Sequence, residues 1–289
     1  MGKTRKINKV LVSQPTLEGA GVHLRRGFGF REVPMFDPFL MFDDFRQDDP
    51  DKYLPGFPWH PHRGIETITY MLEGEVDHGD YLGNSGAIRG GDVQWMTAGS
   101  GIIHQEMPRG DEHGPMGGFQ LWANLPAAQK MTDPRYQGFE ASEMPVVESD
   151  GARIRVVCGM AGEIGGPVHG IAIDPELLDV ILGPDVTWSH PTPQGHTYFA
   201  YLFEGDARFG GASDSVTAGQ GTLVLFGDGG SISAQAGGGG TRFLLAGGRP
   251  LHEPIAWRGP IVMNTREELD IAWRELDDGT FVKTGGQRA

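Results

Sequence analysis

The chain has 289 residues, with 24 Lys and Arg against 38 Asp and Glu, and a formal net charge of −14 at pH 7. Binding to nucleic acid depends on clustered cations that neutralise phosphates. Here the basic cluster is confined to the amino-terminal tail, at Lys3, Arg5, Lys6 and Lys9. We interpret it as a solvated arm. The charge therefore argues against direct contact with nucleic acid.

Glycine and proline are abundant, with 46 and 20 residues, which is about twice their ordinary share. They punctuate short apolar runs from one end of the chain to the other, a pattern typical of many short strands joined by tight turns. A chain of this length is also long enough to form two cores. The composition predicts a folded, mostly β protein.

Cys158 is the sole cysteine, so an intrachain disulfide is excluded, and this fits a reducing compartment. The first residues lack the apolar core of a signal peptide, and every apolar stretch is too short to span a membrane. We expect a soluble, cytoplasmic protein without a membrane partner.

The first candidate ligands occur in two pairs with the same spacing: His60 with His62, and His104 with Glu106. Residues i and i+2 of a strand point to the same face, so two such strands inside a barrel would present three imidazoles and one carboxylate to a divalent metal. Burying such groups costs on the order of several kcal/mol for an unpaired charge, which a bound cation would offset. An exposed loop or mutual hydrogen bonds are the alternative.

A second carboxylate competes for the metal. Glu66 has the same parity as His60 and His62, so a regular strand would also turn it toward the interior. The spacing leaves Glu66 and Glu106 both open as ligands. The scattered histidines are expected not to be ligands: His23, His78, His113, His169 and His252.

An internal repeat follows the first pair of histidines. Residues 67–75 (TITYMLEGE) resemble residues 198–206 (YFAYLFEGD) at an offset of 131, and each copy is followed by a second strand set, at 90–96 and at 219–226. Such self-similarity suggests duplication. We predict an all-β fold with two double-stranded jelly-roll β-barrels in tandem.

The two copies are separated by a polar, turn-rich stretch at 133–138, followed by a charged stretch at 140–151. We therefore place a domain boundary near residue 138. Residues 1–137 are predicted to form an N-terminal metal-binding barrel, and residues 138–289 a C-terminal barrel that lacks metal ligands and ends in a helix.

The second copy carries other residues at the ligand positions. The offset places Pro191, Pro193 and Thr197 where the first copy has its two strand histidines and Glu66, and none of the three offers an imidazole or carboxylate. His190 and His196 break the i, i+2 spacing and are predicted to be turn or surface histidines. We expect the second barrel to be structural, a wall of the pocket or a partner surface.

The last predicted element is a helix. Thr265 is its predicted N-cap, and Glu268 three residues later completes a capping box. Leu269, Ala272, Trp273 and Leu276 then recur at helical spacing before Gly279 ends the element. We expect the apolar face of this helix to pack on a barrel, with a partner-binding helix as the alternative.

These motifs resemble the cupin superfamily and, more specifically, the pirin family. The resemblance covers about residues 20–280 and is weak from about 140 to 195. The segments that carry it are 37–45 (DPFLMFDDF), 60–67 (HPHRGIET), 91–99 (GDVQWMTAG), 101–106 (GIIHQE), 121–125 (LWANL), 248–254 (GRPLHEP) and 259–265 (GPIVMNT).

The resemblance implies a bicupin whose first barrel binds one iron through His60, His62, His104 and Glu106, with Glu66 as a neighbouring pocket residue. Iron as Fe(II) comes from the resemblance alone, because the donor set also suits Mn, Ni, Cu, Co or Zn. Four protein ligands on an octahedral metal would leave positions open for substrate and dioxygen, as in a catalytic site.

The resemblance also implies a reaction, the quercetin 2,3-dioxygenase cleavage of a flavonol by O2 to a depside and carbon monoxide. Glu106 would serve as ligand and general base in turn. Phe57, Trp59 and Trp95 are candidate pocket walls for this small phenolic substrate.

The competing hypothesis is a metal-dependent regulatory protein that acts through protein contacts, as a transcriptional co-regulator or a modulator of a metabolic enzyme. A metal-dependent isomerase, or an oxygenase acting on another phenolic, is a third candidate.

Overall fold

The structure is a computed structural model that describes residues 3–109, 114–211 and 214–283. Two compact units divide the chain. We name them the first barrel (Pro15–Val33, Phe39–Ala141 and Leu251–Ala289) and the second barrel (Met1–Gln14, Pro34–Pro38 and Ser142–Pro250). Each unit takes segments from distant parts of the sequence.

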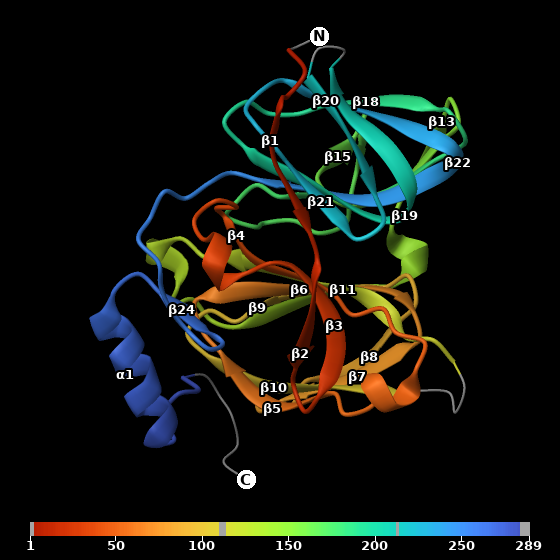
Figure 1. The fold of residues 1–289 in the computed structure, drawn as a ribbon. Helices are drawn as coiled ribbons and strands as arrows, with labels where there is room; N and C mark the ends of the chain where they lie inside the picture. Colours follow the sequence, from red (N-terminus) through yellow and green to blue (C-terminus); the bar gives the residue numbers. More distant parts are fainter. Residues whose placement is uncertain (1–2, 110–113, 212–213, 284–289) are drawn as a thin grey trace. The chain divides into compact units, whose positions relative to one another are not determined.

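The first barrel consists of two antiparallel sheets that face each other (Figure 1). The strand order of the larger sheet is β12-β9-β6-β11-β4-β3-β2, and that of the smaller sheet is β5-β10-β7-β8. The bounds are β2 (Gln14–Glu18), β3 (Val22–Phe28), β4 (Phe39–Asp44), β5 (Phe57–His62), β6 (Ile65–Glu73), β7 (Glu75–Asp80), β8 (Ser85–Arg89), β9 (Val93–Thr97), β10 (Ile102–Arg109), β11 (Gly117–Asn124) and β12 (Arg135–Phe139).

The connections of the first barrel include short 3-10 turns, and its last segment adds a hairpin and a helix. The turns are η1 (Phe30–Glu32), η2 (Pro50–Lys52) and η3 (Ala127–Gln129), with η4 (Ala141–Glu143) at the change of unit. The last segment contains β23 (Ala256–Arg258), β24 (Ile261–Met263) and α1 (Arg266–Asp277).

The second barrel is built on one antiparallel sheet with the path β1-β21-β19-β22-β17-β14-β13, to which β18 and β20 are added through β22 and β19. The bounds are β1 (Ile7–Val12), β13 (Val146–Ser149), β14 (Ala152–Cys158), β17 (Glu176–Leu182), β18 (Thr187–Pro191), β19 (Thr197–Gly211), β20 (Asp214–Gly219), β21 (Thr222–Phe226) and β22 (Ser231–Gly248), with a small hairpin of β15 (Met160–Ala161) and β16 (Ile164–Gly165).

The predicted repeat is present in the strands. Its two Glu-Gly steps place Gly74 and Gly205 at positive φ, 79° and 68°, where a side chain would be strained. At Gly74 the chain breaks between β6 and β7, whereas β19 continues through Gly205 with a bulge on either side. The same duplicated unit is therefore folded as two strands in one barrel and as one long bent strand in the other.

The predicted domain ranges, 1–137 and 138–289, differ from the compact units. A boundary at 138 would fall within β12, which pairs with β9 and so belongs to the first barrel. Each end of the chain also belongs to the other barrel than predicted. Strand β1 pairs with β21 of the second barrel, and residues 251–289 belong to the first barrel. Local composition finds the change between the units near Ser142, but pairing between distant segments decides where the ends go.

The amino-terminal arm corrects a second prediction. Arg5 is 1% exposed, not solvated, and its guanidinium donates to Thr192 Oγ1 and to the carbonyls of Pro193, His196 and Gly227. A buried cation with this many acceptors is satisfied without a counter-ion in contact. The arm is thus an integral part of the second barrel from Arg5 onward.

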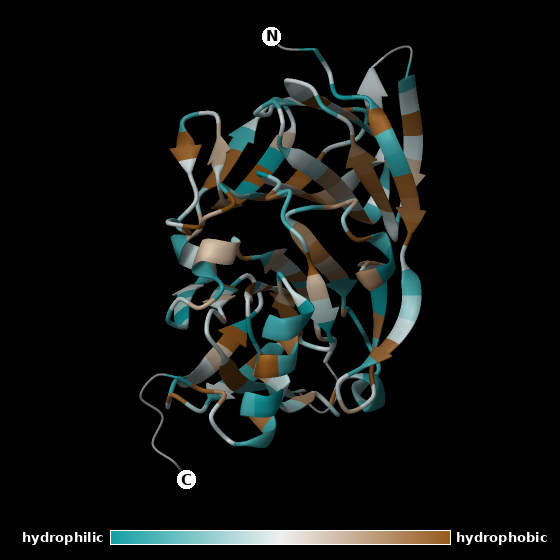
Figure 2. Cartoon of the chain, turned by 90° about the vertical axis from the view of Figure 1, so that its left-hand side faces the viewer, coloured by the Kyte–Doolittle hydropathy of each residue, from teal (hydrophilic) through white to brown (hydrophobic). Residues whose placement is uncertain are grey.

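The helix prediction is confirmed at its start. Thr265 Oγ1 accepts from the backbone N–H of Glu268 at 3.2 Å, and the Glu268 carboxylate accepts from the N–H of Thr265 at 3.0 Å. Figure 2 shows the bands of polar and apolar residues along α1. Leu269 and Ala272 are buried in a cluster with Ile261 and Met263 of β24, so the helix packs within the first barrel.

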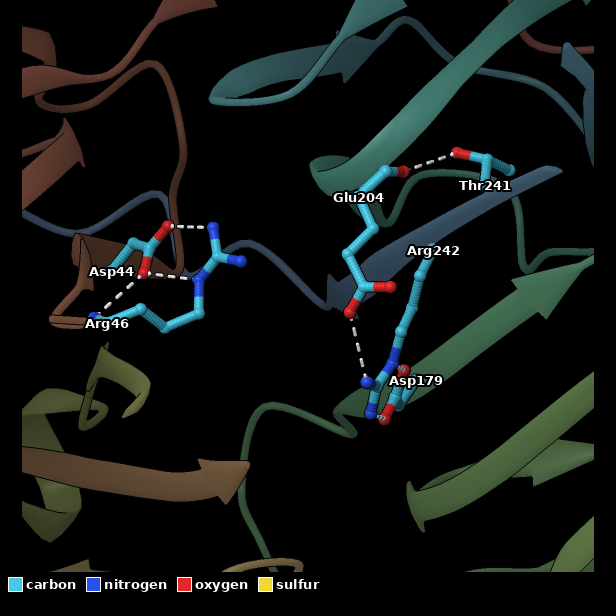
Figure 3. A network of polar contacts seen from close by, with 6 residues as sticks. All are labelled: Asp44, Arg46, Asp179, Glu204, Thr241 and Arg242. Carbon is cyan, nitrogen blue, oxygen red and sulfur yellow. Dashed lines mark hydrogen bonds and ion pairs between the residues drawn. The ribbon is translucent and has the colours of Figure 1, made fainter. Parts of the chain in front are cut away.

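In each barrel, a buried carboxylate is paired with an arginine. In the first barrel, Asp44 accepts two hydrogen bonds from the Arg46 guanidinium (Figure 3). In the second barrel, Asp179 accepts two from Arg242, which also reaches Glu204 at 3.3 Å. These bidentate pairs satisfy carboxylates that are 2% exposed.

Candidate metal centre

Three histidines from neighbouring strands meet inside the first barrel. His60 and His62 lie on β5, and His104 lies directly opposite His60 on β10. The ring centroids are 4.4 Å apart for His60 and His104, 4.8 Å for His60 and His62, and 5.1 Å for His62 and His104. One ligand nitrogen from each ring lies within 4.8 Å of the others. The three imidazoles can therefore share one ion.

Hydrogen bonds orient two of these rings. Nδ1 of His60 lies 2.9 Å from the Pro58 carbonyl, and Nδ1 of His62 lies 3.3 Å from the Pro260 carbonyl. A carbonyl can only accept, so each Nδ1 carries the proton and each Nε2 keeps its lone pair. This is the arrangement by which proteins fix the tautomer of a metal-binding histidine.

Burial keeps two of the rings uncharged. His62 and His104 are 2% and 1% exposed. Burial lowers the pKa of both well below 6.5, and the neighbouring imidazoles lower it further. A neutral imidazole is the form that binds a metal.

His104 provides the test of whether this donor set fits a metal. Within the described residues, neither of its ring nitrogens has a hydrogen-bond partner. A buried polar atom without a partner costs about 1–3 kcal/mol, and two on one ring call for a compensating interaction. Coordination of a metal by one of these nitrogens would supply it, so the residues present fit a bound cation.

Glu106 is placed in the same interior. It is 8% exposed, and its Oε1 accepts from the Thr69 hydroxyl at 3.1 Å. Strand β10 pairs with β7 in continuous register, with Glu106 opposite His78 and His104 opposite Asp80. Glu106 and His104 are two residues apart on β10, so they share one face of the smaller sheet. Burial raises the pKa of Glu106, while the electrostatic interaction with His60 and the Thr69 hydrogen bond oppose this shift. Its carboxylate stands outside the close group of three imidazoles.

Glu66 lies on the face of the larger sheet that points away from the cavity. It accepts from the Thr97 hydroxyl at 2.8 Å, and its strand neighbour Thr67 is paired with Trp122, which lines the cavity. The expectation of matching parity fails because β5 and β6 are separate strands. Gly64, with φ +76°, turns the chain between them and resets which side faces inward.

His60 and His62 open into a cavity of about 760 Å³ that is lined by residues of both sheets of the first barrel. Its polar lining near the site comes from His60, His62, Glu106, Thr69 and Gln120. Apolar side chains form most of the remaining wall, among them Leu24, Met41, Phe45, Phe57, Val76 and Met116.

Aromatic rings form a continuous row along the cavity. Trp122 lies edge-on to His62, with ring centroids 5.1 Å apart. Trp257 follows at 6.1 Å from Trp122, and the exposed Phe30 at 5.5 Å from Trp257. Such a row provides a wall for a planar aromatic ligand between the surface and the imidazoles.

Two related family models match the two parts of the chain. A sequence model of pirin matches residues 21–123, and one of the pirin C-terminal cupin domain matches residues 177–282. A pirin-like protein from Caulobacter vibrioides is 45% identical over 280 residues, which cover 96% of this chain and 99% of that relative. The chain belongs to the pirin family.

Two further comparisons carry the name of an activity. A Pseudomonas aeruginosa protein, provisionally named a quercetin 2,3-dioxygenase, is 41% identical over 287 residues, which cover 97% of this chain and 99% of that relative. A solved structure of quercetin 2,3-dioxygenase from Acinetobacter baumannii superposes with a TM-score of 0.88 at 31% identity, over 96% of this chain and 98% of that one. The bicupin fold predicted from sequence is thus confirmed.

The predicted pocket walls are placed differently from one another. Phe57 lines the cavity. Trp59 is 47% exposed, and its ring contacts that of Tyr81. Trp95 is buried on the same face of the larger sheet as Glu66. The sequence reasoning did not identify Trp122 and Trp257 as wall residues. Trp122 is two residues from Gln120 on β11, so both lie on the inward face once the strand is known.

The second barrel lacks a comparable centre among the described residues. Pro191 ends β18, Pro193 follows that strand, and Thr197 starts β19. The prediction of a turn or surface position is wrong for His190, which is 4% exposed, with Nε2 2.9 Å from the Glu176 carboxylate. The scattered His113 lies outside the described residues. Within the part of the chain that the structure describes, no helix is long and apolar enough to cross a membrane.

Proposed function

We propose that this pirin-family chain is a metal-dependent dioxygenase of the quercetin 2,3-dioxygenase type. The observation that carries the proposal is a close group of three imidazoles, in which His60 and His62 line an aromatic cavity and His104 has both ring nitrogens unpartnered within the described residues. The names of the P. aeruginosa and A. baumannii proteins support the same reaction class.

His60, His62 and His104 would hold the metal, with Glu106 as the fourth ligand. Fe(II) is the metal we propose, and when bound it would supply the Lewis-acid and redox chemistry of the reaction. The Nδ1 hydrogen bonds of His60 and His62 direct their Nε2 lone pairs into the interior.

The cavity would bind the flavonol with its fused rings along Trp122 and Trp257 and its 3-hydroxyl toward Glu106. Glu106 would accept the hydroxyl proton on its carboxylate, because burial raises its pKa and strengthens it as a base. Thr69 holds one carboxylate oxygen at 3.1 Å and fixes the direction of the other. The overall reaction consumes one O2 and releases one carbon monoxide with the depside.

The test is oxygen uptake and carbon monoxide release by the Fe(II)-loaded protein with quercetin. We expect His104→Ala and Glu106→Gln to reduce both to the background of free Fe(II). Glu66→Gln is the matched control, because it removes a buried carboxylate on the other face of the sheet and should keep the activity. A metal-loaded wild-type protein with no quercetin-dependent oxygen uptake would overturn the dioxygenase proposal and favour a regulatory role through protein contacts.

A further inference from the structure

The last segment of the chain contacts the strand that carries two of the histidines. We name residues 256–281, from β23 through α1 to Phe281, the clasp. The backbone N–H of Val262 donates to the Arg63 carbonyl at 3.0 Å, and Arg63 forms a parallel bridge with Ile261. Arg63 directly follows His62, so the clasp holds the chain at the end of β5.

The side chain of Arg63 is enclosed by the clasp. It is 1% exposed, pairs with the Glu275 carboxylate at 2.7 Å and donates to the Phe281 carbonyl at 2.9 Å. Its guanidinium carbon lies 4.2 Å from the centroid of the Phe281 ring. A buried guanidinium needs such partners, and removal of its counter-charge would leave an uncompensated cation.

The same clasp reaches the candidate metal centre. Pro260 supplies the carbonyl that faces Nδ1 of His62 at 3.3 Å, and Trp257, Gly259 and Pro260 line the cavity. Pro260 immediately precedes Ile261, the bridge partner of Arg63. Displacement of the clasp would therefore remove the acceptor that fixes the His62 tautomer.

The fit between the clasp and the β5 end is close. A Cβ on Gly64 would lie 1.9 Å from the Val262 carbonyl oxygen, so a side chain is excluded there. Buried Lys130 joins both sides, because its Nζ donates to the carbonyls of Gly64 and Val262 and to Asn124. The clasp is thus held in one register against the strand.

We propose that Arg63, Glu275 and Phe281 are positioning residues of the metal centre, which act by holding the Pro260 carbonyl against His62. The inference rests on the metal centre proposed above and extends it to residues that contact neither metal nor substrate. Outer partners of metal-binding histidines typically contribute about 10–100-fold to metal affinity.

The experiment compares two substitutions that differ in the loss of the ion pair with Arg63. Glu275→Gln removes both ion pairs of Glu275, with Arg63 and with Lys283, whereas Lys283→Gln removes only the exposed pair of Lys283 Nζ with Glu275 at 2.7 Å. Cobalt(II) alone is the probe, titrated into the full metal-free chain and followed by its visible absorption spectrum. Circular dichroism of each metal-free variant checks that it is folded.

We expect Glu275→Gln to weaken cobalt binding about 10-fold or more and to alter the cobalt spectrum, while Lys283→Gln leaves both unchanged. Glu275→Asp should restore part of the affinity because it keeps the charge. Equal affinity and an identical spectrum for Glu275→Gln and wild type would overturn the inference. If wild type itself binds no cobalt, the metal centre fails rather than the clasp.

A second variant covers the case in which Glu275→Gln does not fold. Phe281→Leu removes the ring beneath Arg63 but keeps the Phe281 carbonyl position and both charges. We expect weaker cobalt binding with an altered spectrum here too. Wild-type affinity and spectrum in this variant would contradict the proposal independently.

Discussion

The two barrels share a repeated sequence but differ in their interiors. The interior of the first barrel is hollow, with His60 and His62 at the cavity wall and His104 close to both. The second barrel is filled by a large apolar cluster in which the Phe209 ring contacts the rings of Phe226 and Phe243. The difference teaches that the jelly-roll frame is stable with either interior, so one copy is free to keep a cavity for chemistry.

The polar residues inside the second barrel satisfy one another. His190 Nε2 and the Tyr198 hydroxyl both reach Glu176 Oε2, at 2.9 Å and 2.8 Å, and the Trp188 ring stacks on His190. In contrast, both ring nitrogens of His104 in the first barrel are unpartnered within the described residues. The satisfied group around Glu176 indicates a structural role, whereas the unpartnered nitrogens of His104 fit a metal-binding role.

The largest expected effect is a loss of stability, compared between the filled and the hollow interior by the same Phe→Ala substitution. Phe209→Ala should destabilise the second barrel by about 3–5 kcal/mol, because a fully buried ring leaves an empty space. Phe45→Ala, at the wall of the existing cavity, should cost clearly less. Urea unfolding of both variants measures this, and equal costs would show that the first barrel is packed as fully as the second.

The next effect sharpens the contrast between the two sets of histidines. His104→Ala should weaken metal binding at least 100-fold, or about 2.7 kcal/mol, because one of three close imidazoles is lost. His190→Gln should leave the metal affinity and stoichiometry as in wild type. Metal titration with elemental analysis checks both, and a loss of metal on substitution of His190 would place a site in the second barrel.

A pH dependence follows from the low pKa of His104. The unfolded chain takes up a proton near pH 6.5, whereas the folded chain resists it because burial lowers the pKa. The contribution of this histidine to stability is therefore complete above pH 6.5 and decreases as the pH falls below it.

The matching measurement compares metal-free wild type with His104→Gln by urea unfolding at pH 6.5 and 5.5. The stability of wild type relative to the variant should fall by about 1 kcal/mol over this interval. A constant difference would mean that His104 is protonated as easily in the folded chain as in the unfolded one.

The last expected effect concerns the internal hydrogen bonds of the second barrel. Tyr198→Phe removes a hydroxyl that donates to buried Glu176 and should cost about 1–2 kcal/mol of stability. Cobalt binding should be unaffected. An equal loss in metal affinity would contradict the division of roles between the barrels.

Much of the fold and the candidate site was predictable because strand periodicity is local. The i, i+2 spacing of His60 and His62 predicts a shared face, and the repeat predicts the second barrel. The position of Glu66 was not predictable, because a turn at Gly64 changes the parity of the next strand. Neither was the burial of Arg5 or the contact of Glu275 with Arg63, since these join segments 187 and 212 residues apart.

The exchange of chain ends has a consequence for the order in which the protein is made. Every strand of the second barrel that the structure describes ends by Gly248, before the ribosome reaches Ala256. The first barrel, although it begins earlier, lacks the Pro260 carbonyl, Trp257 and α1 until that late stage. The candidate metal centre is therefore completed only after every described strand of the second barrel has been synthesised.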